Sequence, residues 1–255
     1  MLNKHIPTER LKRLKLVVFD SDGVLVPRGT VIRETVTDES IHLSITAHIL
    51  SGALAELLRR LRERFIIVVS SGRSLLYLQT MYGGIVGERT VLQAENGNLS
   101  LIEGTVVQHV GYDEVHFATL AAIREEARAL PIRGIEPKQF IVSIHADREI
   151  KDVYDIVKRH DTRNELTTLW NGEAFDIQRK DVSKAEGLAK LCKHLGITLG
   201  ETAAIGDRVN DTELLAHTGI GVSADKEAVG SEYWTEGEGL PGELFARYLI
   251  EALGL

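Results

Sequence analysis

The 255-residue sequence contains a single cysteine and no excess of positive charge. One cysteine, Cys192, excludes an internal disulfide framework and a zinc site built from several cysteines. The formal net charge is -7 and the isoelectric point is about 5.8. An acidic chain of this kind disfavours a broad nucleic-acid surface, so we expect no nucleic acid among its partners.

Long apolar runs, internal repeats and low-complexity segments are also missing. No run of about 18 apolar residues is present, which excludes a membrane-spanning helix. Residues 1–20 contain no apolar stretch with a small-residue cleavage site, so a secretory signal is not expected. The composition is 44% hydrophobic and 26% charged, the balance of a globular protein rather than a disordered or collagen-like chain. We therefore expect a cytoplasmic globular protein with no membrane partner.

Short apolar runs alternate with longer stretches that have helical periodicity. The runs are apolar at consecutive positions, as strands buried on both faces are. Such an alternation predicts an α/β fold with a Rossmann-like parallel-sheet core and right-handed crossovers. The apolar runs that we assign to this sheet are residues 14–19, 65–70, 201–207 and 220–224.

The periodicity changes in the middle of the chain. Within residues 110–178 the strand-like segments alternate apolar and polar residues, as an antiparallel sheet with one solvated face does. This change predicts a smaller α+β cap domain, inserted into a core formed by residues 1–109 and 179–255. Residues 27–48 also alternate like strands, which predicts a hairpin beside the site.

Polar residues follow the predicted core strands at the point where each strand ends. In open α/β sheets, ligands bind beyond the carboxyl ends of the strands. A lysine also stands before the helix that follows the insert. The residues at these positions are Asp20, Asp22, Ser71, Gly72, Lys184, Asp207, Asn210 and Asp211.

These residue types point to the chemistry of a metal and a phosphate. Clustered carboxylates repel one another unless a cation joins them, and a set of oxygen ligands favours Mg²⁺. A lysine and a hydroxyl beside a glycine amide suit an oxyanion such as phosphate. An aspartate facing a bound phosphate can be a nucleophile, and a second carboxyl a general acid and base. Each residue alone has an ordinary explanation as a cap, a turn or a solvated side chain; together, and in this order, they favour a site.

The sequence resembles the haloacid dehalogenase-like (HAD) hydrolase superfamily along nearly its whole length. Four segments carry the resemblance in the family's order: VVFDSDGVL, IIVVSSGRS, DVSKAEGLAKL and AAIGDRVNDTELL. The predicted insert lies between the second and third of them. This placement is similar to the branch with an α/β cap, the Cof-like and sugar-phosphatase relatives.

The resemblance implies the roles of four carboxylates. Asp20 would attack phosphorus, and Asp22 would protonate the leaving oxygen and then activate water. Mg²⁺ would bind Asp20, the backbone carbonyl of Asp22 and Asp207. Asp211 would support the metal directly or through a neighbouring ligand.

The resemblance also implies a phosphate site. Ser71 and the Gly72 amide would hold phosphate oxygens, and Lys184 would neutralise charge on the nucleophile and the phosphate. Asn210 would add a contact to phosphate or substrate. Arg73 has two interpretations, a contact with substrate or a salt bridge within the core.

The function that the resemblance implies is a Mg²⁺-dependent phosphatase, a phosphoric monoester hydrolase that acts through an aspartyl phosphate. Its partner would be a small phosphorylated metabolite, either a sugar phosphate or an acid such as phosphoglycolate. A phosphomutase or phosphotransferase would use the same aspartyl phosphate and is an alternative. A non-catalytic binding protein on this fold is another, although the complete set of site residues argues against it.

Overall fold

The computed structural model describes residues 1–255, which form two compact units. The first unit contains residues 1–28, 48–109 and 183–255, and the second contains residues 29–47 and 110–182. The division expected from the sequence differs in two places. Residues 29–47 belong to the second unit rather than to the core, and the insert extends to residue 182 rather than 178.

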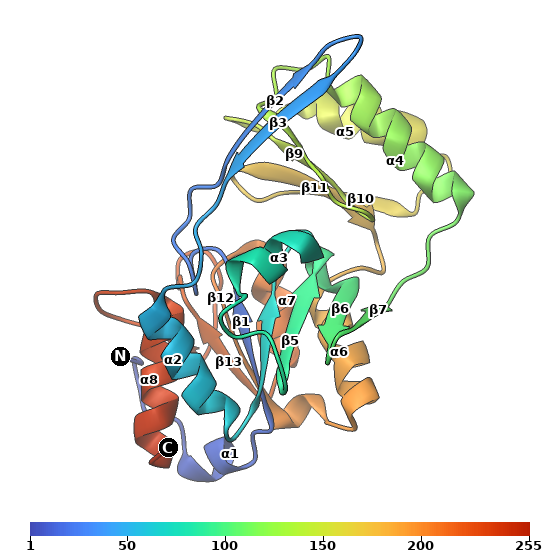
Figure 1. Cartoon of the computed structure of the whole chain (residues 1–255). Helices are drawn as coiled ribbons and strands as arrows, with labels where there is room; N and C mark the ends of the chain where they lie inside the picture. Colours follow the sequence, from blue (N-terminus) through green and yellow to red (C-terminus); the bar gives the residue numbers. More distant parts are fainter. The chain divides into compact units, whose positions relative to one another are not determined.

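The first unit is built on one eight-stranded sheet (Figure 1). Six neighbouring strands are parallel, and the last two, β6 and β7, are antiparallel. This confirms the predicted α/β class with a Rossmann-like parallel core. In order across the sheet the strands are β14 (Tyr233–Trp234), β13 (Ile220–Ser223), β12 (Thr202–Gly206), β1 (Leu16–Asp20), β4 (Ile66–Ser70), β5 (Thr90–Ala94), β6 (Leu99–Ile102) and β7 (Thr105–Gln108).

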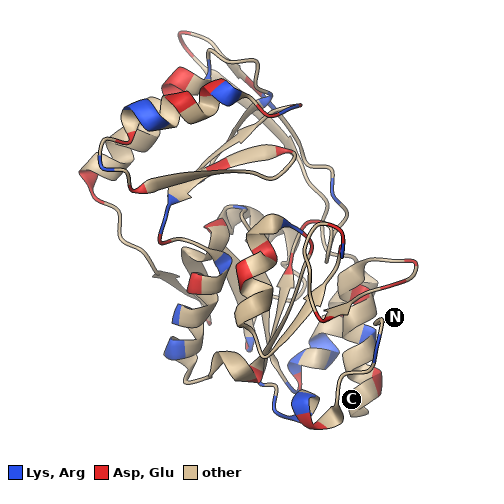
Figure 2. Cartoon of the chain, turned by 180° about the vertical axis from the view of Figure 1, so that it is seen from behind, with Lys and Arg blue, Asp and Glu red and all other residues tan.

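Helices cover both faces of this sheet, which explains why its central strands are apolar at consecutive positions. On one face, Val18 of β1 belongs to the same apolar cluster as Leu188 and Leu214 of two helices. On the other face, the ring of Phe19 lies 6.0 Å from that of Phe245. In Figure 2 the strands of this sheet are almost entirely tan, and the charged residues of the first unit lie mainly on helices and loops.

Helix α2 of the first unit begins at a side-chain cap. Its N-cap residue Ser51 accepts a hydrogen bond from the amide of Leu54 at 3.2 Å. None of the helices in the chain combines the length and apolar character that crossing a membrane requires. The helical segments of this unit are α1 (Thr8–Lys12), α2 (Gly52–Arg62), α3 (Leu75–Met81), η1 (Glu95–Gly97), α6 (Lys184–Leu195), η2 (Leu199–Glu201), η3 (Val209–Asp211), α7 (Thr212–His217) and α8 (Pro241–Leu253).

The second unit is an antiparallel sheet with two helices and a hairpin (Figure 1). The helices and one face of the sheet enclose an apolar core that includes Leu120, Val153 and Phe175. This arrangement agrees with the α+β character expected from the alternating pattern. Its elements are β2 (Val31–Val36), β3 (Ile41–Thr46), α4 (Glu114–Ala127), β8 (Gly134–Glu136), β9 (Val142–His145), α5 (Lys151–His160), β10 (Leu166–Trp170) and β11 (Ala174–Arg179), with the sheet order β10-β11-β9-β8.

Glu34 explains why the β2–β3 hairpin belongs to the second unit. Its backbone amide donates to the carbonyl of Arg133 at 3.0 Å. Its carboxylate accepts from the amide of Ile135 at 3.1 Å and pairs with Arg128 at 3.1 Å. The alternating pattern correctly predicts a hairpin, but these contacts depend on tertiary structure and have no signature in the local sequence.

Candidate active site

The parallel register brings the motif residues to one edge of the first unit's sheet. Asp20 is the last residue of β1 and lies opposite Ser70 of β4. On the other side, Phe19 pairs with Ile205 of β12, so the chain leaves β12 next to Asp20. The turns that carry Ser71 and Asp207 therefore begin on either side of Asp20, at the carboxyl ends of the strands.

Lys184 lies between two of the buried carboxylates. Its ammonium nitrogen is 2.5 Å from Oδ1 of Asp20 and 2.7 Å from Oδ1 of Asp211. All three side chains are less than one tenth exposed. Lys184 begins α6, whose N-cap Ser183 accepts from the amide of Glu186. The start of this helix fixes the point from which the lysine reaches the carboxylates.

Asp211 uses both of its carboxylate oxygens within the protein. Oδ1 accepts from Lys184, and Oδ2 accepts from the backbone amides of Asp207 at 3.1 Å and Arg208 at 3.3 Å. The side chain is fully buried. Asp211 therefore holds the turn after β12 in place, which is a supporting position relative to Asp207.

Asp207 has capacity left for a further ligand. Its Oδ2 accepts from the guanidinium of Arg28. Its Oδ1 is buried and has no hydrogen-bond partner. One oxygen of each of Asp20, Asp207 and Asp211 lies within 4.8 Å of the others. Buried polar atoms are nearly always satisfied in proteins, so an orphaned carboxylate oxygen in this cluster fits a cation.

The cluster's electrostatics also favour a further positive charge. Burial raises the pKa of Asp20 well above its ordinary value, Lys184 opposes this, and Asp211 and Asp207 raise it further. Burial likewise raises the pKa of Asp207, with Arg28 opposing. Burial alone would lower the pKa of Lys184, but the carboxylates of Asp20 and Asp211 outweigh it and raise that pKa. Three carboxylates thus face two cations, and the oxygen donor set suits Mg²⁺.

Asp22 forms a salt bridge with Arg73. The guanidinium donates from Nε to Oδ2 of Asp22 at 2.8 Å and from Nη2 to Oδ1 at 2.7 Å. Of the two interpretations that the sequence leaves for Arg73, the structure shows the salt bridge. The Asp22 side chain is about a quarter exposed, at 26%, whereas that of Arg73 is buried. Asp22 therefore reaches solvent while its carboxylate plane is fixed by two hydrogen bonds.

Besides Lys184, three residues are predicted to contact the phosphate, and their surroundings differ. Ser71 is buried, and its hydroxyl accepts from the amide of Arg73 at 3.2 Å. Gly72 is half-buried, and its amide makes no hydrogen bond within the protein. Asn210 lies in η3, half-buried, and makes no hydrogen bond with the other site residues. The hydroxyl of Ser70, the residue before Ser71, donates to the side-chain oxygen of Gln93 at 3.0 Å.

An open cleft of about 560 Å³ lies beside Asp207. Its walls include Gly23, Arg28, Lys226 and Trp234. Sequence reasoning identified none of the last three as site residues. Arg28 follows the first motif closely in the chain, which is a weak signal, and Lys226 and Trp234 lie beyond the fourth motif and belong to none of the four.

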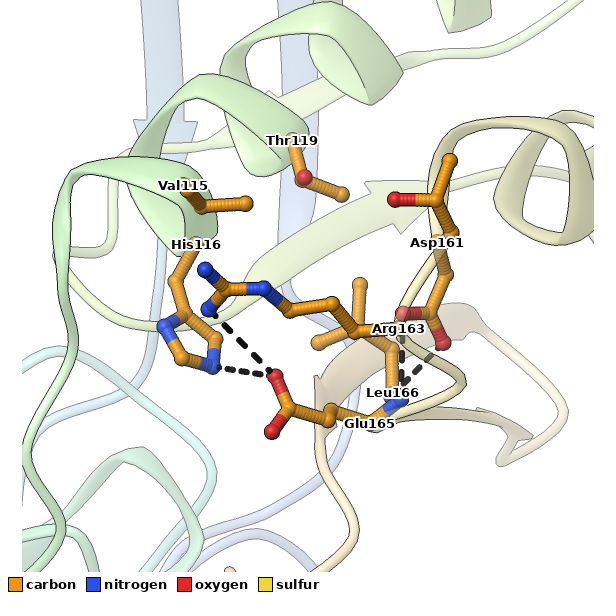
Figure 3. Close-up of a pocket in the computed structure, with 8 residues that line it drawn as sticks. Val115, His116, Thr119, Asp161, Arg163, Glu165 and Leu166 are labelled. Carbon is orange, nitrogen blue, oxygen red and sulfur yellow. Dashed lines mark hydrogen bonds and ion pairs between the residues drawn. The ribbon is translucent and has the colours of Figure 1, made fainter.

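The second unit carries a separate network of charged side chains (Figure 3). His116 lies 2.6 Å from Asp113 through Nδ1 and 3.0 Å from Glu165 through Nε2. Arg163 donates to Asp113 at 2.7 Å. The cavity that these residues border holds only about 10 Å³, room for one water molecule. The network therefore ties the first turn of α4 to the chain before β10 and offers no space for a substrate.

Comparisons with known proteins agree with this geometry. The model of a family described as haloacid dehalogenase-like hydrolase matches residues 124–227, which include Lys184, Asp207 and Asp211. A phosphoglycolate phosphatase from Methanopyrus kandleri is 28% identical over 212 residues, covering 82% of this chain and 83% of that protein. The chain is therefore similar to haloacid dehalogenase-like hydrolases. A phosphoglycolate phosphatase from Halobacterium salinarum is 26% identical over 178 residues, covering 66% of this chain and 68% of the other.

Solved structures share the fold of this chain. A trehalose-6-phosphate phosphatase related protein superposes with a TM-score of 0.68 at 17% identity, covering 94% of this chain and 98% of that one. A phosphatase of the haloalkanoate (HAD) enzyme superfamily from Bacteroides thetaiotaomicron gives 0.67 at 16% identity, covering 99% of both chains. Together with the family model and the named relatives, they confirm the predicted enzyme class. The chain is a phosphatase.

Proposed function

We propose that this phosphatase hydrolyses a small phosphorylated metabolite with the help of Mg²⁺, by way of a phosphoryl group carried on Asp20. The observation that supports this best is the pairing of Asp20 with Lys184 beside the orphaned oxygen of Asp207. A carboxylate at the end of a strand, next to a fixed cation and an unpaired carboxylate oxygen, is arranged for attack on a phosphate.

Asp20 is the nucleophile in this proposal. Lys184 supports its ionised form against the burial that opposes it, and carries positive charge toward the phosphoryl oxygens. Asp20, Asp207 and the backbone carbonyl of Asp22 would hold Mg²⁺, with Asp211 keeping Asp207 in place. When bound, the metal supplies positive charge that balances the phosphate and the carboxylates.

The phosphate is held by groups on the neighbouring turn. The Gly72 amide, which has no partner in the protein, and the hydroxyl of Ser71 are the donors offered there. Asn210 would contribute from the far side of the cluster. Each donor orients the phosphate in line with Asp20, and positioning of this kind accounts for much of phosphoryl-transfer catalysis.

Asp22 transfers protons in both halves of the reaction. It donates a proton to the leaving oxygen as Asp20 bonds to phosphorus, and it then accepts a proton from the water that attacks the phosphorylated Asp20. Its partial exposure gives it access to this water. The second half regenerates the free carboxylate of Asp20 and releases inorganic phosphate.

The two named relatives suggest the substrate class. Both are phosphoglycolate phosphatases, which favours a small phosphorylated acid. The open cleft beside Asp207 is bordered by Arg28 and Lys226, two cations that suit a second anionic group. Sugar phosphates are the alternative class for the same site.

The first experiment measures inorganic phosphate release from phosphoglycolate, sugar phosphates, nucleotides and p-nitrophenyl phosphate, with Mg²⁺ and with EDTA. We expect release that depends on the metal and falls by at least about 100-fold in Asp20→Asn. Asp155→Asn, an exposed aspartate of α5, is the matched control and should retain full activity. Absence of phosphate release from every compound would refute the proposal.

A second experiment tests the covalent step directly. Protein denatured in acid during turnover of a ³²P-labelled aryl phosphate, whose leaving oxygen needs no proton, should retain label on the peptide that contains Asp20. Asp20→Asn should retain none, and Asp22→Asn should retain more than wild type because the second half is slowed. Label on any other peptide would contradict the assignment of Asp20.

A further inference from the structure

We propose that Arg73 is the positioning residue of the acid–base group, and that its two hydrogen bonds to Asp22 set the rate at which the phosphorylated Asp20 is hydrolysed. This inference rests on the proposed function. It assigns to Arg73 a role in proton transfer instead of a contact with substrate.

The geometry that carries the inference is a bidentate pair on a rigid turn. Nε and Nη2 of Arg73 each reach a different oxygen of Asp22, at 2.8 and 2.7 Å. The backbone of Arg73 is itself held on both sides: its amide donates to the Ser71 hydroxyl at 3.2 Å, and its carbonyl accepts from the amide of Glu95 at 2.9 Å. The guanidinium therefore fixes the plane in which the Asp22 carboxylate lies.

This contact limits the directions in which the O–H of a protonated Asp22 can point. Arginine remains protonated in proteins and can only donate, so an O–H of Asp22 cannot point toward it. When Asp22 carries a proton, one of its oxygens stays on Arg73 and the O–H must point away from the guanidinium. Arg73 thus selects which oxygen exchanges the proton and holds it in a constant direction.

The two halves of the reaction depend on this direction in different ways. In the first half, Asp20 bonds to phosphorus, the bond to the leaving oxygen breaks with its electron pair on that oxygen, and Asp22 supplies the proton. In the second half, water bonds to phosphorus and gives a proton to Asp22. The bond between phosphorus and Asp20 breaks, and its electron pair stays on Asp20. An aryl oxide such as p-nitrophenolate leaves without a proton, so with that substrate only the second half needs Asp22.

The test is rapid-mixing kinetics of Arg73→Met with p-nitrophenyl phosphate. We expect a burst of p-nitrophenolate, about one per active site, followed by a steady rate at least about 10-fold below wild type. KM should fall by about the same factor, because the first half alone sets kcat/KM and is unchanged with this substrate. Asp22→Asn should show the same burst. With an alkyl phosphate substrate, for which the first half also needs a proton, Arg73→Met should show no burst and a larger loss of kcat.

Two further variants distinguish a positioning role of Arg73 from a loss of folded structure. Arg73→Lys can still donate one hydrogen bond to Asp22 and should recover part of the steady rate. If Arg73→Met does not fold, Arg73→Lys should still show a steady rate below that of wild type. Arg62→Met, which removes a half-buried arginine bonded to the Ile85 carbonyl, is the matched control and should behave as wild type.

Two results would overturn the inference about Arg73. A raised KM with unchanged kcat in Arg73→Met would mean a substrate contact and would overturn the inference. An equal loss on aryl and alkyl substrates without a burst would overturn it as well. A wild-type enzyme that releases no phosphate would instead refute the proposed function.

Discussion

The ammonium group of Lys184 lies 2.5 Å from Oδ1 of Asp20, and both side chains are almost completely buried. The two residues are 164 positions apart in the sequence. Asp20 precedes the inserted unit in the sequence and Lys184 follows it. A buried carboxylate and a buried ammonium stabilise each other only while both are present, since removal of one leaves the other unpaired. A substitution in this pair should therefore change both the activity and the free energy of unfolding.

Lys184→Met should destabilise the metal-free protein by about 3–5 kcal/mol, because Asp20 and Asp211 would remain buried without their shared cation. Asp20→Asn should cost less than about 1 kcal/mol, because Lys184 keeps Asp211 as a partner. Urea unfolding measures the free energy of unfolding of both variants. Lys193→Met, which removes an exposed lysine of the same helix, should be neutral. A larger cost for Asp20→Asn than for Lys184→Met would contradict this account.

Arg28→Gln should bind Mn²⁺, a probe for oxygen-ligand sites, about 3- to 10-fold more tightly than wild type. Arg28 occupies Oδ2 of Asp207, so a metal ion must overcome a partly exposed ion pair, worth roughly 1 kcal/mol, to use that carboxylate fully. Electron paramagnetic resonance of free Mn²⁺ during a titration gives the affinity without any assay of activity. Arg28→Lys keeps the positive charge and should bind as wild type does. Weaker binding by Arg28→Gln would show that the arginine supports the metal instead of competing with it.

The sequence predicts the core well because its information there is local. Consecutive apolar residues predict each buried strand, and parallel pairing then brings the residues after β1, β4 and β12 to the same edge. Asp20 and Asp207 could be placed together on that ground alone. The direction of a long side chain depends on its tertiary neighbours, so the partners of Arg28 and Arg73 could not be deduced.

The boundaries of the inserted unit were harder to predict for a related reason. Strand β8 has only three residues, too few for a periodic pattern. The attachment of the β2–β3 hairpin to the second unit depends on Glu34, whose partners are about a hundred positions away in the sequence. Alternation predicts that the hairpin forms but not which sheet or helix it contacts.

Gly187→Ala should destabilise the protein by about 1–3 kcal/mol through overpacking and lower kcat. A Cβ at Gly187 would lie 2.5 Å from the backbone of Gly97, which has a φ of +92° in the turn after β5. Gly187 lies three residues after Lys184, so a shift of α6 moves the ammonium group away from Asp20. Thermal unfolding and steady-state kinetics measure the two effects. Gly52→Ala, in the first turn of α2 with open space around it, should be neutral or slightly stabilising. Unchanged kcat in Gly187→Ala would show that the contact does not position Lys184.

Cys192 should not react with an aromatic disulfide reagent at pH 8 while the protein is folded. Its side chain is buried in α6, and burial raises the pKa of the thiol to about 11. At pH 8 about one thiol in a thousand is then ionised, and only the thiolate attacks a disulfide. One equivalent should react after the protein is unfolded in guanidinium chloride, and Cys192→Ser should give no signal in either state. Because the reaction requires opening of the helix that carries Lys184, its rate in Lys184→Met should exceed that of wild type. Equal rates in the two proteins would show that the Lys184 pair does not limit this opening.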